Sequence, residues 1–257
     1  MVNDTVTCLN GARMAAVPGV VHGFTTREGG VSLGGCSSLN LAVRAGDPPE
    51  CVQENWRRVA LRFGVEPAQI AVLSQVHGNR VLRVFEGRGA LQPVGEADAA
   101  VCTVSGVLLA VRVADCVPVL FAAPGGIAVA HAGWRGVALQ VVQRTVEALC
   151  MATGARPDAV VASIGPHISQ PAFEVGEEVV EALVASGVAP EGWIDRTGVR
   201  PHVDLGFVVR EQLRGAGVIS IDHLESCTYF DQRFFSHRRD GDASGRFAGV
   251  IAMKGSR

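Results

Sequence analysis

The chain has 257 residues, and its 23 basic and 25 acidic residues give a net charge of −2. This balance offers no broad basic surface for nucleic acid or for an anionic membrane. Hydrophobic residues make up 48% of the chain, and the N-terminus lacks the features of a signal peptide. We therefore expect a single cytoplasmic domain over residues 1–257, without nucleic-acid or membrane partners.

The first predicted elements are a strand and a helix. The apolar run 20–25 is typical of a strand and leads into a glycine turn. A helix is predicted to start at Asp47, which can cap its N-terminus, and to run to about Phe63. Gly64 is the expected stop, because glycine readily adopts the left-handed conformation that ends helices.

The middle of the chain predicts further strands. Residues 70–75 and 80–85 are expected to be strands joined by a tight turn at His77-Gly78-Asn79. The apolar runs 107–113 and 118–122 are also typical of strands, and the chain breaks between them. This part of the chain therefore contributes mainly to β-structure.

The second half alternates between the two kinds of element. Strands are predicted at 127–130 and 160–164, and a helix is predicted at 137–151 by its apolar periodicity. Two more helices are expected at 176–186 and 205–214, each followed by glycine. Irregular alternation of this kind favours an α+β (mixed α/β) domain with mixed sheets.

Three potential metal ligands, His77, Cys116 and His131, lie where predicted strands end. Side chains at strand ends can converge at the rim of a sheet. Two imidazoles and one thiolate suit zinc, and three protein ligands leave the fourth tetrahedral position open, as in catalytic zinc sites. Their spacing matches no local zinc signature, and isolated histidines and cysteines at such positions are also common as structural residues. The residue types alone leave both interpretations open.

The segments around these residues resemble the YfiH-type family. Its members are variously labelled multicopper polyphenol oxidase (laccase-like), peptidoglycan editing factor and purine nucleoside phosphorylase. The resemblance covers nearly the whole chain, and ADCVPV with AHAGWRG is its most specific pair of motifs. Other matching segments are HGFTTREGGVS, SQVHGNRV, EADAAV, IGPHIS and FFSHRRDG.

The resemblance implies a layered α/β/β/α domain with mixed β-sheets. It also implies that the metal ligands are His77, Cys116 and His131, with zinc as the expected metal and copper as a second candidate. Because copper outcompetes zinc at most nitrogen and sulfur sites, it could occupy the same ligands opportunistically.

The activity implied by the resemblance is that of a purine nucleoside enzyme. Phosphorolysis of adenosine, inosine, guanosine and methylthioadenosine is expected, with adenosine deamination as a second activity. Asp115 is a candidate proton carrier beside Cys116 and His131. Arg135 and Arg238 are candidate phosphate ligands, because guanidinium groups offer fork-shaped donors to phosphate. Ion pairing or a structural role is the alternative for both arginines.

Two other functions are weighed against this one. Cys116 as nucleophile and His131 as base would make an amide hydrolase that edits a peptidoglycan precursor. A copper polyphenol oxidase is less consistent with the sequence, because none of the 7 histidines forms the His-x-His pairs of a trinuclear copper cluster. Metal content separates these readings, since stoichiometric zinc favours the metalloenzyme.

Four positions carry a second interpretation. Trp134 either stacks on a nucleobase or packs in the core. His167 stands where the family commonly has cysteine, so it is either close to the metal or a local structural residue. Arg44 and His237 are less typical of the family, which bears on the details of substrate contact.

Overall fold

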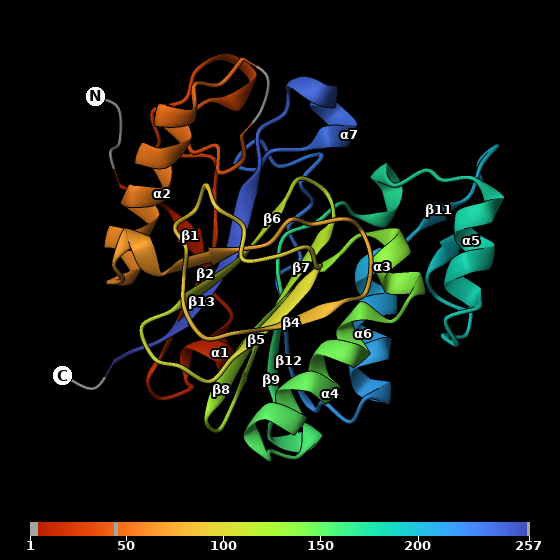
Figure 1. The fold of residues 1–257 in the computed structure, drawn as a ribbon. Coiled ribbons are helices and arrows are strands. Elements are labelled where there is room, and N and C mark those ends of the chain that lie inside the picture. Colours follow the sequence, from red (N-terminus) through yellow and green to blue (C-terminus); the bar gives the residue numbers. More distant parts are fainter. Residues whose placement is uncertain (1–4, 44–45, 256–257) are drawn as a thin grey trace.

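Two β-sheets packed face to face form the centre of the computed structural model, which describes residues 5–43 and 46–255 (Figure 1). Arg44 lies outside these residues. The first sheet has the order β1 (Cys8–Leu9), β2 (Val20–Thr25), β13 (Phe247–Met253), β6 (Leu108–Val113), β3 (Ile70–Val72). The second has the order β12 (Ser220–His223), β9 (Val161–Ile164), β7 (Val117–Ala123), β8 (Gly126–Ala132), β5 (Ala99–Cys102), β4 (Val81–Val84).

Both sheets are mixed. In the first, β3 runs parallel to β6, while β13 pairs antiparallel with both β2 and β6. In the second, the outer pairs β12–β9 and β4–β5 are parallel, and the central strands are antiparallel. A separate antiparallel pair joins β10 (Ile194–Asp195) to β11 (His202–Val203).

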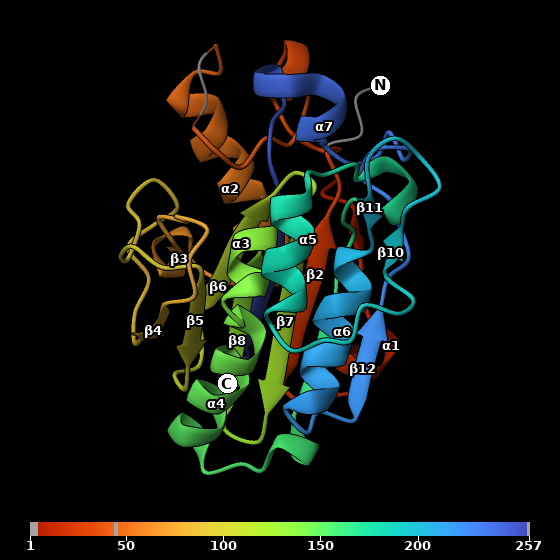
Figure 2. The same cartoon turned by 90° about the vertical axis from the view of Figure 1, so that its right-hand side faces the viewer.

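Helices cover the outer faces of the two sheets (Figures 1 and 2). The described helices are α1 (Ala12–Ala15), α2 (Pro49–Phe63), α3 (Trp134–Ala138), α4 (Val141–Thr153), α5 (Glu177–Val184), α6 (Leu205–Gly215) and α7 (His237–Asp240). Short 3-10 turns occupy Gly34–Cys36, Pro67–Gln69, Pro157–Ala159, Gln170–Ala172 and Gly241–Ala243. The predicted layered α/β/β/α fold is therefore confirmed. None of the described helices is long and apolar enough to cross a bilayer.

Three apolar layers hold this arrangement together. Trp56 and Val59 of α2 pack on the outer face of the first sheet. Phe24 and Leu109 of the first sheet meet Leu120 of the second between the sheets. The outer face of the second sheet packs on α3, α4, α5 and α6. Every residue of β7 is buried, because one face meets a sheet and the other meets helices.

The first predicted strand and helix are present with one correction. β2 covers the predicted residues, and α2 ends at Phe63 with Gly64 in the left-handed conformation, at φ 69°. Asp47 does not cap α2, which begins after Pro48 without a side-chain cap. Its Oδ2 instead accepts hydrogen bonds from Ser32 (2.9 Å) and Asn40 (2.5 Å), so tertiary contacts rather than the helix N-terminus hold this carboxylate.

Two connections were predicted incorrectly. The segment at His77 is not a tight turn within one sheet, because it carries the chain from β3 in the first sheet to β4 in the second. The helix predicted at 137–151 is divided into α3 and α4, because Gln140 adopts a left-handed φ of 60°. Asp204 does cap α6, accepting from the Phe207 N–H at 2.8 Å. Gly215 lies inside that helix.

Candidate metal centre

His77, Cys116 and His131 converge at one end of the two sheets. Their ligand atoms all lie within 4.8 Å of one another, and we refer to the three residues as the ligand cluster. The two imidazole rings meet edge-on, with their centroids 4.8 Å apart and an interplanar angle of 71°. His131 is buried, Cys116 is half-buried and His77 is exposed, so one side of the cluster faces solvent.

Different elements supply the three side chains. His131 is the second-last residue of β8, where its backbone N–H donates to the carbonyl of Asp98 at 2.7 Å. Cys116 ends the connection from β6 to β7, directly after Asp115, whose φ is 91°. His77 also has a left-handed φ, 61°, in the connection from β3 to β4. Non-glycine residues rarely adopt this conformation, and they concentrate at functional sites.

Asp98 holds two members of the ligand cluster in place. Its carboxylate accepts hydrogen bonds from the backbone N–H groups of Val76 (3.2 Å), His77 (2.9 Å) and Gly78 (2.7 Å). The same fully buried carboxylate accepts from Nδ1 of His131 at 2.8 Å. Because Nδ1 donates to Asp98, the Nε2 lone pair of His131 is left to bind a metal.

Sequence reasoning missed Asp98. One signal was available: this carboxylate stands directly before β5, a strand that is buried at every position. An ionisable side chain in such surroundings is expected to have specific partners, because burying an unpaired charge is costly. The partners themselves lie on distant segments, and only the fold identifies them.

The electrostatics of the cluster differ between its two histidines. Burial alone would lower the pKa of His131, but the neighbouring Cys116 and Asp98 side chains raise that pKa to about 9. For His77, burial lowers the pKa, and the neighbouring charge on His131 lowers it further. At neutral pH the free protein thus holds a proton on His131, which a metal ion must displace.

Gly133, the residue before α3, leaves space for this cluster. A Cβ atom built at Gly133 would lie 2.7 Å from Nδ1 of His77 and 3.2 Å from Sγ of Cys116. Real Cβ atoms do not approach other atoms as closely as the shorter of these distances. The glycine of the AHAGWRG motif is therefore required for the packing of two potential ligands.

Two cavities flank the ligand cluster and share His77, Cys116 and His237. The larger cavity has a volume of about 540 Å³, and its polar lining includes Ser74, Gln75, Arg112, His131 and Arg246. The smaller cavity has a volume of about 150 Å³, and its lining includes Trp134, Arg135, Ile168, Phe173, Leu205 and Arg238. The cluster thus borders one cavity with mixed polar and apolar lining and one whose lining is mainly apolar.

The predicted proton carrier and phosphate ligands lie at the smaller cavity. Asp115 accepts hydrogen bonds from Oγ1 of Thr228 and from the backbone N–H of Arg238, both at 2.6 Å. The Arg238 guanidinium donates to two backbone carbonyls and lies 5.3 Å from the ring centroid of Phe173. The exposed Arg135 guanidinium lies over the ring of the half-buried Trp134, 4.3 Å from its centroid.

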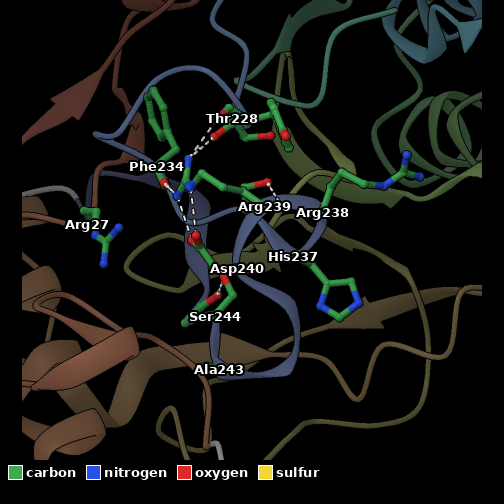
Figure 3. Close-up of polar contacts among 12 residues, drawn as sticks. Arg27, Thr228, Phe234, His237, Arg238, Arg239, Asp240, Ala243 and Ser244 are labelled. Atoms are coloured by element: carbon green, nitrogen blue, oxygen red, sulfur yellow. Dashed lines mark hydrogen bonds and ion pairs between the residues drawn. The ribbon is translucent and has the colours of Figure 1, made fainter. Parts of the chain in front are cut away.

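A network around Arg239 shapes the segment that carries His237 and Arg238 (Figure 3). The Arg239 guanidinium donates to the carbonyls of Thr228, Tyr229 and Phe234, and it pairs with Asp240. The side chains of His237 and Arg238 extend away from this network in Figure 3. They are the two that reach the cavities.

His167 lies outside the ligand cluster. Its ring stacks on that of His223, with centroids 5.3 Å apart and an interplanar angle of 15°. Its Nδ1 donates to the carbonyl of Gly165 at 2.8 Å, and the side chain is buried. This geometry supports the local structural interpretation of His167. His237, by contrast, donates from Nδ1 to the Gly241 carbonyl at 3.0 Å and lines both cavities.

Comparison with known proteins places the chain in a family. A family model described as multi-copper polyphenol oxidoreductase laccase matches residues 21–254. The chain belongs to this family. Among its relatives is the purine nucleoside phosphorylase of Deinococcus radiodurans, 42% identical over 238 residues, or 91% of this chain and 89% of that protein. Purine nucleoside phosphorylase YfiH of Escherichia coli is 39% identical over 236 residues, or 91% and 93% of the two chains.

Solved structures agree with membership of the YfiH-type family. YlmD from Geobacillus stearothermophilus matches with a TM-score of 0.88 and 33% identity, over 95% of this chain and 94% of that one. The hypothetical protein YfiH from Bacillus licheniformis matches with a TM-score of 0.87 and 29% identity, over 91% and 93% of the two chains. The layered fold is therefore shared along nearly the whole length of this YfiH-type protein.

Proposed function

We propose that this YfiH-type protein is a zinc-dependent purine nucleoside phosphorylase of the cytoplasm. Its proposed substrates are adenosine, inosine, guanosine and methylthioadenosine, with adenosine deamination as a second activity. One observation carries the proposal: the ligand cluster lines two cavities, one that offers polar and charged side chains to a phosphate and one that offers aromatic rings to a purine. The names of the relatives from Deinococcus radiodurans and Escherichia coli support the reaction type.

The donor set of the ligand cluster fits zinc. Two imidazole nitrogens and one thiolate sulfur, all within 4.8 Å of one another, can share a single tetrahedral ion. A bound zinc ion would supply Lewis acidity at its open position. Copper favours the same nitrogen and sulfur donors and remains the second candidate.

The residues of the smaller cavity are proposed to hold the nucleoside. Trp134 and Phe173 offer aromatic surface for the purine, and Arg135 and Arg238 are proposed to contact the substrate beside them. Asp115 remains a proposed proton carrier. Since both of its oxygens already accept hydrogen bonds, its proposed first task is to hold Arg238 at the cavity wall.

Incubation of the zinc-loaded protein with adenosine, with and without phosphate, tests the proposal. Chromatography would separate adenine, inosine and hypoxanthine. We expect adenine only when phosphate is present, and inosine, the deamination product, under both conditions. The matched control is Cys116→Ser, which removes the thiolate donor. If no base is released from adenosine, or from the other three nucleosides under the same conditions, the proposal is contradicted.

An amide hydrolase that edits a peptidoglycan precursor is the second candidate, and one observation favours it. The arrangement matches that of cysteine hydrolases: His131 lies beside Cys116, the possible nucleophile, and its Nδ1 donates to the carboxylate of Asp98. This arrangement leaves His77 without a role, whereas a metal site uses all three members of the cluster. Activity of a metal-free preparation that disappears when Cys116 is alkylated would favour the hydrolase.

A copper polyphenol oxidase is the third and least favoured candidate. The family model carries a multi-copper description. Among the described residues, however, one group of three ligands could hold a metal, which falls short of the several coppers that a blue oxidase needs. Measured copper and zinc contents of the purified protein would decide this point.

A further inference from the structure

Arg112 on β6 stands apart from the other arginines that line a cavity beside the ligand cluster. Its half-buried guanidinium lines the larger cavity, and its side chain donates one hydrogen bond, to the carbonyl of Leu73 at 2.8 Å. A guanidinium carries five N–H donors, so most of them are available to the cavity. Among the described residues no carboxylate lies within ion-pairing distance of Arg112.

A desolvated cation without an anionic partner is unfavourable. Burial lowers the pKa of Arg112, and no negative charge offsets this effect. The contrast is Arg239, another largely buried arginine, whose guanidinium pairs with Asp240. Buried charges are usually paired, so Arg112 has the property expected of a residue whose partner is a bound anion.

Neighbouring residues hold Arg112 in a fixed position. The Gln75 side chain donates to the Arg112 carbonyl at 2.8 Å and accepts from its backbone N–H at 2.9 Å. Residues 75 and 112 lie on separate strands or their extensions, so this pair fixes the backbone at the cavity wall. Preorganised donors of this kind are what a specific anion site needs.

Arg246, the residue directly before β13, adds a second guanidinium to the lining of the same cavity. Arg112 is paired in register with Ala248, and Arg246 lies two residues before Ala248, which makes it a diagonal neighbour of Arg112. Arg246 donates to the carbonyls of Ser244 and Gly245 and also lines the larger cavity. His77 and Cys116 line this cavity as well, so the charge of Arg246 lies on the same cavity wall as the ligand cluster.

We propose that Arg112, together with Arg246, forms a phosphate site in the larger cavity. The inference rests on the proposed function and divides the substrates between the two cavities. Inorganic phosphate binds at Arg112 before the reaction, and the phosphate group of ribose 1-phosphate occupies the same site afterwards. The nucleoside base lies across the ligand cluster, in the smaller cavity with Trp134 and Phe173.

The reaction balances with this placement. An oxygen of hydrogen phosphate forms a bond to C1′ of the ribose, and the bond from C1′ to N9 of the purine breaks. The electron pair of that bond leaves with the purine, which takes up the proton that the phosphate loses. The arginine charges stay in place throughout, because guanidinium groups do not titrate near neutral pH.

Titration calorimetry with inorganic phosphate on the zinc-loaded protein tests the site directly. Arg112→Met is expected to weaken phosphate binding by at least about tenfold, since hydrogen bonds to charged groups are worth that much or more. Arg112→Lys keeps one charge and a donor for Leu73 but loses the fork, so its affinity should be intermediate. Arg144→Met, on the exposed face of α4, removes the same charge and should bind phosphate like the unchanged protein.

Arg238→Met tests the rival assignment at the smaller cavity, and we expect it to raise the KM for the nucleoside rather than weaken phosphate binding. If Arg112→Met and Arg112→Lys both bind phosphate normally, the phosphate site is not at Arg112. Nucleoside cleavage with an unchanged phosphate KM in these variants would overturn the site and leave the proposed function standing. If phosphate binding depends on Arg112 but no nucleoside is cleaved, the phosphate site stands and the proposed function is overturned.

Discussion

Asp98 shows how a single side chain can organise a candidate metal centre without being one of its proposed ligands. It accepts from three backbone N–H groups around His77 and from Nδ1 of His131. Asp98→Asn is expected to weaken zinc binding by about tenfold to a hundredfold, the usual effect of losing such a partner. Competition with a chelator of known affinity would measure this change. Unaltered zinc affinity would show that the backbone alone orients the two imidazoles.

Cys116 provides the sharpest test of the ligand cluster. Cys116→Ser should remove most of the bound zinc, because a hydroxyl is a far poorer zinc ligand than a thiolate. Cys150→Ser, on α4 and outside the cluster, is the matched control and should keep its metal. Elemental analysis after gel filtration gives the result. A Cys116→Ser protein that keeps its zinc but loses all activity would support a nucleophilic role.

At the residue scale, the sequence identified the members of the ligand cluster mainly through recognisable motifs. It did not identify Asp98 or Arg112, because no local sequence pattern indicates which residues these two side chains contact. Asp98 acts on residues about twenty and thirty positions away along the chain. Arg112 is distinguished by the lack of a carboxylate partner for its guanidinium among the described residues. Such roles depend on tertiary contacts, which local spacing does not encode.

The junction between β8 and α3 is the element on which the site depends most. Gly133→Ala would place a Cβ atom 2.7 Å from Nδ1 of His77, so that His77 or the junction must move. We expect zinc occupancy to fall well below half at equal zinc concentration. Gly215→Ala is the matched control, since a Cβ there meets no atom within 4 Å. Equal zinc occupancy in the two variants would show that the junction between β8 and α3 accommodates the added methyl group without weakening zinc binding.

Most elements were predictable because their apolar patterns match their burial. β2, α2 and the core of β7 follow directly from apolar runs with clear stops. The neighbours of each strand in its sheet were not predictable from such patterns. The apolar run of β3, for example, does not indicate which of the two sheets the strand belongs to. β5, β12 and β13 were also not predicted as strands, and two of them, β5 and β12, have only four residues each.

The stacked pair of His167 and His223 affects the stability of the whole molecule. Burial and the neighbouring His167 lower the pKa of His223 from 6.5 to about 4, and burial lowers the pKa of His167. The unfolded chain therefore binds more protons between these pH values, and stability is complete above about pH 6.5 and falls as pH drops toward 4. Because His223 is partly exposed, we expect its share to be on the order of 1 kcal/mol.

Urea unfolding of the unchanged protein and of His223→Gln at pH 7.5 and pH 5 would measure this effect. The variant should lose less stability between the two pH values than the unchanged protein does. An equal loss would assign the pH dependence to other groups, such as the buried His22, whose pKa is also lowered by burial. A single transition in these curves would support the prediction that residues 1–257 form one domain.

Two of the connections that cross between the sheets carry members of the ligand cluster, so a bound ion would also tie the sheets together. His77 lies on the crossing from β3 to β4, and Cys116 lies on the crossing from β6 to β7. An ion bound to both would act as a removable cross-link between two layers that are otherwise held by apolar packing. Chelation should then lower the melting temperature and expose the inter-sheet layer to proteases, and Cys116→Ser should resemble the chelated protein. The metal ion that is proposed to take part in the reaction would therefore also stabilise the packing of one sheet on the other.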